Sequence, residues 1–152
     1  MRVSFRSLAL ISALSATALA CEDRTRNEAM LFLTRYEALD LDAPLEERRD
    51  AVAELRGLVL STEEVRSARD ACVEAYEAEI LAEDQHAEAT TQLLAASAGG
   101  AETVPTEAAA RIEAAIQQSQ EAIERTRELF PRCEREARGL RSRFSAPRPT
   151  QR

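Results

Sequence analysis

Residues 105–144 read PTEAAARIEAAIQQSQEAIERTRELFPRCEREARGLRSRF, and one face of this stretch is almost continuously apolar or small. The positions on that face recur in alternating steps of four and three, the spacing that lets one long helix pack along another. Pro131 falls inside the series without changing its phase, so we expect a kink and not a break. The series comprises Ile112, Ile116, Ser119, Ile123, Thr126, Phe130, Cys133, Ala137, Leu140 and Phe144.

A second long helix is expected just before this one. Residues 62–97 contain neither Pro nor Gly, consist largely of good helix formers, and would span about 54 Å as a helix. Gly99-Gly100 breaks that helix and Pro105 restarts the next, which predicts a loop from Ala98 to Thr106. Two helices joined by so short a loop should pack antiparallel, as a hairpin.

The cysteines Cys72 and Cys133 indicate the register of this hairpin. Facing residues of an antiparallel pair have numbers that add to a constant, and the midpoint between positions 72 and 133 falls inside the predicted loop. Both cysteines also lie on the apolar face of their own helix. We therefore expect them to meet and to form a disulfide.

Two shorter helices are expected ahead of the hairpin, over residues 26–41 and 44–56, with a turn between them. Together they nearly match the length of one arm. The expected fold is all-α: an elongated helical bundle built on a long antiparallel helical hairpin, with two shorter N-terminal helices along its disulfide-bound end. The tip near Gly99-Gly100 would be less covered.

Short motifs suggest how the helices begin and end. Thr25 with Glu28, and Ser61 with Glu64, have the spacing of capping boxes. Gly57 is typical of a left-handed C-terminal cap.

The first 20 residues have the features of an export signal. Arg2 and Arg6 precede an uncharged segment, residues 7–20, that is too short for a transmembrane helix. The sequence Ala18-Leu19-Ala20 fits the cleavage rule of ordinary signal peptidase, and an uncleaved anchor is the remaining alternative.

Residues 18–21 also resemble the lipobox of bacterial lipoproteins, although that family prefers Leu where this chain has Ala18. The resemblance implies lipidation at Cys21, which would leave Cys72 and Cys133 to pair with no thiol left over. We expect a signal peptide over 1–20, one helical domain over 21–144 and a disordered tail over 145–152. The alternative is a soluble periplasmic or secreted protein.

Charge is unevenly distributed along the chain. All 20 basic residues are Arg, and without residues 1–20 the chain has 18 Arg against 27 acidic residues, a net charge of −9 that disfavours nucleic acid as a partner. Residues 21–124 carry −15 and residues 125–152 carry +6. The basic segment could contact anionic lipid or cell-wall polymer, or it could simply suit the C-terminal end of a helix dipole.

His86, the single histidine, is the one residue that suggests a metal. Glu83 and His86 form a Glu-x-x-His pair on one helical face, the spacing found in ferritin-like di-iron bundles, and Glu79 could add a third ligand. The alternative is a solvated acidic face with one histidine. No nucleophile, phosphate loop or cofactor motif is present in the sequence, so we expect neither a cofactor nor an enzyme.

Four polar side chains fall on apolar faces. Ser119 and Thr126 could set the register of the two long helices, or bond to carbonyls of their own helix. Tyr36 and Tyr76 are expected at the edge of the core.

These observations favour a membrane-anchored periplasmic or cell-envelope protein that acts as a helical interaction or scaffold module, held to lipid through Cys21 and binding a protein partner. The alternatives are a metal-binding bundle using Glu83 and His86, or a holdase-like periplasmic chaperone.

Overall fold

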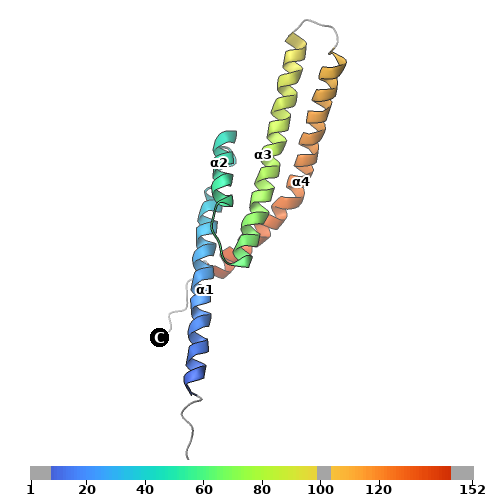
Figure 1. Cartoon of the computed structure of the whole chain (residues 1–152). Helices are drawn as coiled ribbons and strands as arrows, with labels where there is room; N and C mark the ends of the chain where they lie inside the picture. Colours follow the sequence, from blue (N-terminus) through green and yellow to red (C-terminus); the bar gives the residue numbers. More distant parts are fainter. Residues whose placement is uncertain (1–7, 99–103, 145–152) are drawn as a thin grey trace, which may run out of the picture.

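The structure, a computed structural model, describes residues 8–98 and 104–144, with residues 8–21 described by their backbone alone. In this part of the chain there are four α-helices and no strand: α1 (Leu8–Glu37), α2 (Leu45–Arg56), α3 (Glu63–Ala98) and α4 (Thr106–Phe144). Figure 1 shows α3 and α4 as a long antiparallel hairpin, with α1 and α2 beside the part away from its tip. The all-α fold and the hairpin are therefore as expected, and α1 and α2 do not cover the described residues of the hairpin nearest its tip. The glycine pair and residues 145–152 lie outside the described residues.

The first helix differs from expectation because it begins at Leu8 and not near Arg26. The Thr25–Glu28 capping box is therefore wrong, since both residues lie well inside α1. No helix of the described residues has an apolar stretch of the length that a membrane span requires.

Glu28 instead joins α1 to the start of α3. Its Oε2 accepts hydrogen bonds from the backbone amides of Ser61 (3.1 Å) and Thr62 (2.8 Å), and its Oε1 accepts one from the Ser61 hydroxyl. Desolvation opposes ionisation, but these hydrogen bonds prevail and lower the pKa of Glu28 to about 2. The Ser61–Glu64 capping box is wrong as well, because Glu64 pairs with Arg143 at 2.8 Å.

The left-handed helix cap predicted at Gly57 is wrong as well. Its φ of −70° and ψ of −5° are right-handed helical values, so no left-handed cap forms. The backbone amide of Gly57 still donates to Ala53 O at 2.9 Å and closes α2. Pro131 lies inside α4 as expected, and Figure 1 shows the helix continuing through a bend in its lower part.

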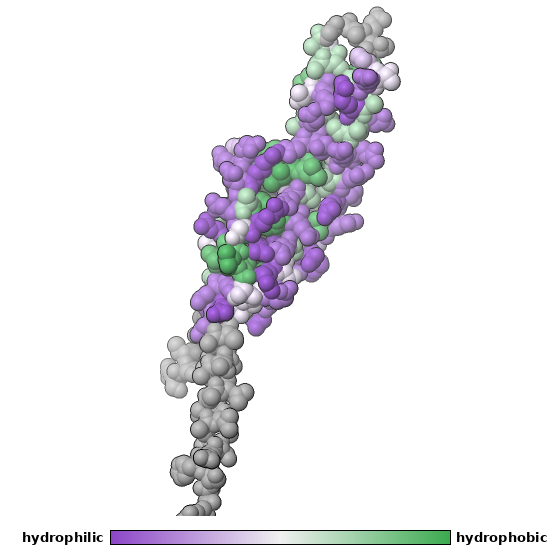
Figure 2. All heavy atoms as spheres, in the orientation of Figure 1, coloured by the Kyte–Doolittle hydropathy of each residue, from purple (hydrophilic) through white to green (hydrophobic). Residues whose placement is uncertain are grey.

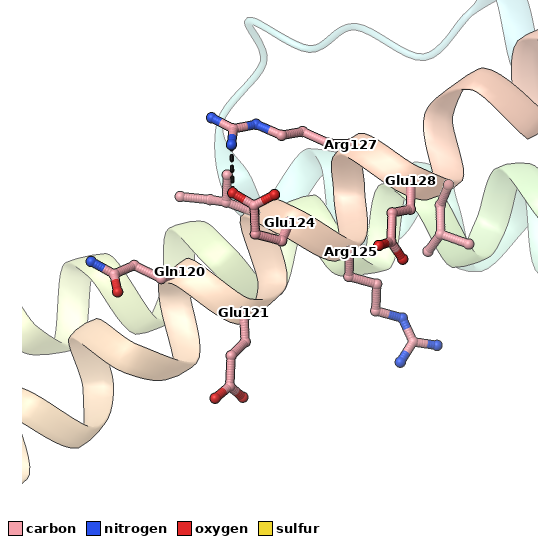
Figure 3. A pocket seen from close by; sticks show the side chains of 8 residues that line it. Gln120, Glu121, Glu124, Arg125, Arg127 and Glu128 are labelled. Carbon is pink, nitrogen blue, oxygen red and sulfur yellow. Dashed lines mark hydrogen bonds and ion pairs between the residues drawn. The ribbon is translucent and has the colours of Figure 1, made fainter.

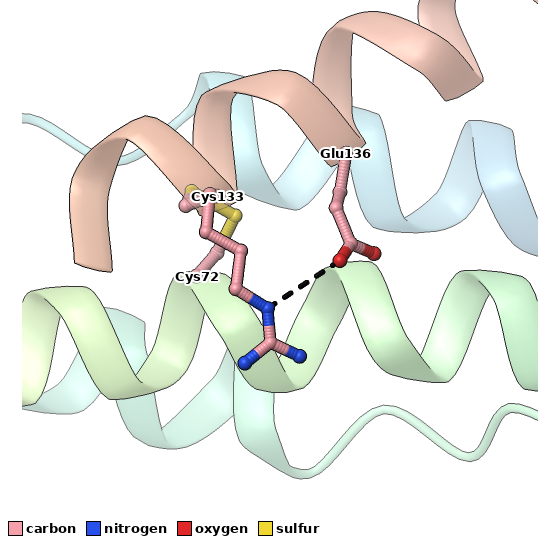
Figure 4. Close-up of a disulfide and its surroundings, with 4 residues drawn as sticks. Cys72, Cys133 and Glu136 are labelled. Carbon is pink, nitrogen blue, oxygen red and sulfur yellow. Dashed lines mark ion pairs between the residues drawn. A yellow bond between two sulfur atoms is a disulfide. The ribbon is translucent and has the colours of Figure 1, made fainter. Parts of the chain in front are cut away.

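The large buried side chains gather where all four helices meet, at the end of the hairpin away from its tip. The fully buried ones are Phe32, Leu55, Val65, Cys72, Cys133 and Leu140. Cys72 and Cys133 lie in the middle of this cluster with their sulfur atoms 2.05 Å apart and their Cα atoms 4.5 Å apart. Figure 4 shows the disulfide linking α3 to α4, beside an ion pair from Arg132 Nε to Glu136 Oε1 at 3.5 Å.

Toward the tip, the contact between α3 and α4 is made mostly by small side chains, with Ile112 as the large one. The alanines Ala78, Ala82 and Ala89 of α3 and Ala115 and Ala122 of α4 are buried there. Alanines allow two helices to approach closely, and the larger side chains are displaced to the flanks of the contact. Ile116 and Ile123, expected within the contact, are consequently 45% and 41% exposed. Leu93 and Leu94 of α3 are exposed as well.

The disulfide should contribute a large share of the stability. It closes a loop of 61 residues, which in the chain-entropy model is worth about 4 kcal/mol. We expect the double variant Cys72→Ala/Cys133→Ala to lose about that much free energy of unfolding in urea titrations. Reductant should destabilise the wild type and leave the variant unchanged, whereas equal effects on both would contradict a disulfide.

Glu28 should make stability fall in acid. A pKa depressed in the folded state adds stability that is complete above the ordinary value of 4.5 and disappears as pH falls toward about 2. At pH 7 we expect Glu28→Gln to cost about 1 kcal/mol. The difference from wild type should shrink between pH 4.5 and pH 2 in urea titrations. Glu74→Gln, at an exposed carboxylate of α3, is the control. A difference that stays constant over this range would refute the role of Glu28.

Candidate functional site

Four aromatic rings contact one another in a row where the C-terminal end of α1 packs against the hairpin. The ring centroids of Phe32 and Tyr36 are 5.8 Å apart, those of Tyr36 and Tyr76 are 6.4 Å apart, and those of Tyr76 and Phe130 are 5.1 Å apart. Tyr76 is buried and Tyr36 half-buried, and burial raises the pKa of both phenols. The two tyrosines thus lie at the edge of the core, as expected. One residue after Tyr36, α1 ends.

A groove between α3 and α4 begins one turn beyond these rings, toward the tip. It has a volume of about 450 Å³, and its lining comes from both arms of the hairpin: Glu79, Ala82, Glu83 and His86 of α3, and Ser119, Ile123, Thr126 and Arg127 of α4. Tyr76 precedes Glu79 by three residues, and Phe130 follows Thr126 by four, so the groove and the aromatic rings share one face of the hairpin. The groove therefore continues the surface of the hairpin on which α1 lies, which we call the seat of α1.

The floor of the groove is small and buried, whereas its α4 wall is apolar and open to solvent. Ala82 and Ser119 are 7% and 5% exposed, and Ile123 is 41% exposed. Ile116 is seven residues before Ile123 and Leu93 is seven after His86, so each lies two turns further along the same face. The exposed apolar surface of this face thus extends from the groove toward the tip.

Ser119 sets the register of the two arms at this point. Its hydroxyl donates to Ala82 O on the opposite helix at 2.9 Å, in a buried position. Of the two interpretations of Ser119, the structure confirms the contact between helices. For Thr126 it confirms the other interpretation, because that hydroxyl donates to Ala122 O of its own helix at 2.8 Å.

Arg48 of α2 pairs with two residues that line the groove, Glu79 and Glu83, and was not anticipated from the sequence. It is only 8% exposed; its Nη2 donates to Glu83 Oε2, and its Nη1 lies 3.7 Å from Glu79 Oε1. The hydrogen bond to Glu83 raises the pKa of Arg48 against the effect of desolvation. Burial raises the pKa of Glu79, and Arg48 opposes this. The available signal was its place in the stripe formed by Leu45, Arg48, Val52 and Leu55.

Glu83 and His86 do lie together in the groove, with Glu79 beside them, as the spacing predicts. Glu83 and Glu79 are, however, both paired with Arg48, which supplies the positive charge that a metal ion would bring. Within residues 22–98 and 104–144, whose side chains the structure describes, no three His, Cys, Asp or Glu side chains come close enough to share a metal ion.

A larger hollow lies along the outside of α4 but does not have the form of a binding site. Its volume is about 930 Å³, and all of its lining residues, among them Gln120, Glu121 and Arg125, come from this one helix. Figure 3 shows these side chains pointing in several directions, with Arg127 paired to Glu124 on one side and Glu121 and Arg125 on the other. The side chains do not converge on a common point, so the groove between α3 and α4 is the better candidate.

Comparison of the chain with protein family models, curated proteins and solved structures finds no match.

Arg48 should matter more for stability than its neighbour Arg49. Arg48→Met would leave Glu79 half-buried without its cation and should cost about 1–2 kcal/mol, less than a fully buried pair because Glu83 is half exposed. Arg49→Met is the matched control; it removes an exposed pair with Asp84 and should cost less than about 0.5 kcal/mol. Thermal and urea unfolding measure both, and equal losses would show that burial of Arg48 is unimportant.

Proposed function

We propose that this protein is an exported cell-envelope scaffold, anchored to a membrane through lipid on Cys21, that holds a protein partner in the groove between α3 and α4 and catalyses no reaction. The observation that carries the proposal is the groove itself, an unfilled continuation of the seat of α1 on the hairpin. A helix already occupies the lower part of this seat, which supports the upper part as a place for another helix.

The position of α1 supports an anchor at one end and a binding surface at the other. The N-terminal part of α1, which includes Cys21, leaves the bundle at the end opposite the tip of the hairpin (Figure 1). A lipid at that point would hold the hairpin with its tip directed away from the membrane. The groove would then be accessible to a partner.

The surface of the molecule fits this arrangement. On the face seen in Figure 2, hydrophilic side chains cover most of the surface, and apolar side chains reach it in separate patches. Exposed apolar side chains on the hairpin beyond α1 include Leu93, Leu94, Ile116 and Ile123. Exposed apolar patches on a highly charged protein are a common feature of interaction sites.

The test is site-specific crosslinking in intact cells, with a photoreactive residue in place of Ile123. We expect an adduct of one discrete mass in the membrane fraction, because Ile123 would contact the partner. Leu31 is the matched control position; it is 45% exposed but lies on α1, far from the groove. Cys21→Ser should move the protein from the membrane to the soluble fraction.

Mass spectrometry of the N-terminal peptide completes this test. A lipid mass on Cys21 is expected, whereas plain cleavage or an intact leader would contradict the anchor. Equal adducts at positions 31 and 123, or none at either, would contradict the proposed binding surface.

A further inference from the structure

We propose that the groove binds a basic amphipathic helix of a partner protein, laid along the hairpin in line with α1. This inference rests on the proposed function and specifies the chemistry of the partner. Three features of the hairpin lead to it: the shape of the vacant seat, its apolar wall and the charge around it.

The residues that line the seat beyond α1 form two facing rows, with the spacing expected for contact with a single helix. On α3, Tyr76, Glu79, Glu83 and His86 follow one another in steps of three, four and three, and Leu93 continues the same face. On α4, Phe130, Thr126, Ile123, Ser119 and Ile116 form the facing row in steps of four and three. The distance from Glu79 to Leu93 along α3 is about 21 Å, the length of a helix of about 14 residues.

The apolar wall selects an amphipathic helix. Ile116 and Ile123 lie two turns apart on α4, and they are 45% and 41% exposed. A helix lying against them would bury an apolar stripe with residues at i, i+3, i+4 and i+7. α1 uses such a stripe on the same seat, where Ala29, Phe32 and Leu33 are buried.

The charge around the seat selects a basic partner. Residues 77–128, which include the groove-lining Arg127, contain eleven acidic residues against three Arg, so this region carries −8. The adjacent α2 does not compensate, since residues 44–56 contain four acidic residues against three Arg. At the groove Arg48 already holds Glu79 and Glu83, and Arg127 pairs with Glu124. The surplus negative charge therefore lies on the flanks, where exposed Glu88 and Glu113 are found. A field of this sign attracts Lys and Arg on the solvent-facing side of a docked helix.

The same charge disfavours the other occupants. A second copy of the chain would bring a second region of −8 against the first, and an anionic lipid surface would also be repelled. Two arginines near the C-terminal end of α4 are already paired within the molecule at its opposite end, Arg141 with Glu37 at 2.7 Å and Arg143 with Glu64 at 2.8 Å.

The experiment measures binding of three designed peptides to the purified full chain by fluorescence anisotropy. The first has about 14 residues of Leu and Lys, with Leu at helical spacing. The second has the same composition with Leu and Lys alternating, and the third has Glu in place of every Lys. We expect the first peptide to bind at least about tenfold more tightly than the other two. Its affinity should fall about tenfold between 50 and 300 mM salt, because the attraction is screened.

Two double variants test where the peptide binds. Ile116→Ser/Ile123→Ser should weaken binding of the first peptide about tenfold, because it removes the apolar wall. Met30→Ser/Leu31→Ser is the matched control; those side chains are 41% and 45% exposed on α1, and affinity should be unchanged. Circular dichroism confirms that both variants remain folded.

The outcomes separate this inference from the function on which it rests. Equal affinities of the acidic and basic peptides would overturn the inference of a basic helix. An affinity that is unchanged in the Ile116→Ser/Ile123→Ser variant would overturn it as well. Self-association in sedimentation that this double variant abolishes would show a second copy as the occupant and would also overturn it. If a discrete crosslink at position 123 persists in cells without peptide binding, the proposed function stands and the partner chemistry is wrong. If both are absent, both proposals fail.

Discussion

The contact between Cys72 and Cys133 is the constraint from which the arrangement of the molecule follows. The Cα atoms of the two cysteines are 4.5 Å apart, so the contact holds the two arms of the hairpin together. It lies within the large cluster of buried side chains in the described part of the chain. From that point toward the tip the arms stay close because alanines face one another, and the bond from Ser119 to Ala82 keeps them in register. Close packing of small side chains, in turn, places Ile116 and Ile123 of α4 on the flank and opens the groove.

The two ends of the hairpin have different roles in this account. The end with the disulfide contains the large side chains, the aromatic rings and the helix that leads to Cys21. The end toward the tip has mostly alanine between its arms, with Ser119 and Ile112, and has an excess of negative charge. One end would be rigid and anchored, and the other thin, acidic and accessible. This arrangement suits a protein that binds another protein.

The long helices and their register could be predicted from the sequence because both depend on periodic patterns that span many turns. The ends of α3 and α4 fall within about one residue of the ranges expected from Pro and Gly. The pairing of the cysteines follows from the same pattern, since an antiparallel hairpin leaves one choice of facing residues. The tip was expected to be less covered on the basis of helix lengths alone, and α1 and α2 do not cover the described residues of the hairpin nearest to it.

The features that sequence reasoning missed depend on contacts between distant residues. Glu28 has the spacing of a local capping box with Thr25, but its carboxylate bonds instead to Ser61 and Thr62, more than 30 residues away. Ile116 and Ile123 follow the same spacing as the buried positions of α4, and only the close approach of the alanines decides which of these faces is covered. Arg48 occupies an apolar stripe where an arginine is unexpected, and its role is visible only once α3 supplies Glu79 and Glu83. The groove thus arises from features that no local motif encodes.

The most direct measurement of the central claim is a peptide map of the unreduced protein after cleavage at arginine. Since every basic residue is Arg, cleavage leaves Cys72 in the peptide 70–111 and Cys133 in the peptide 133–135. We expect one species with the combined mass of these two peptides, which separates into both on reduction. Two separate peptides with alkylated thiols, or either cysteine linked to Cys21, would contradict the register of the hairpin and with it the groove.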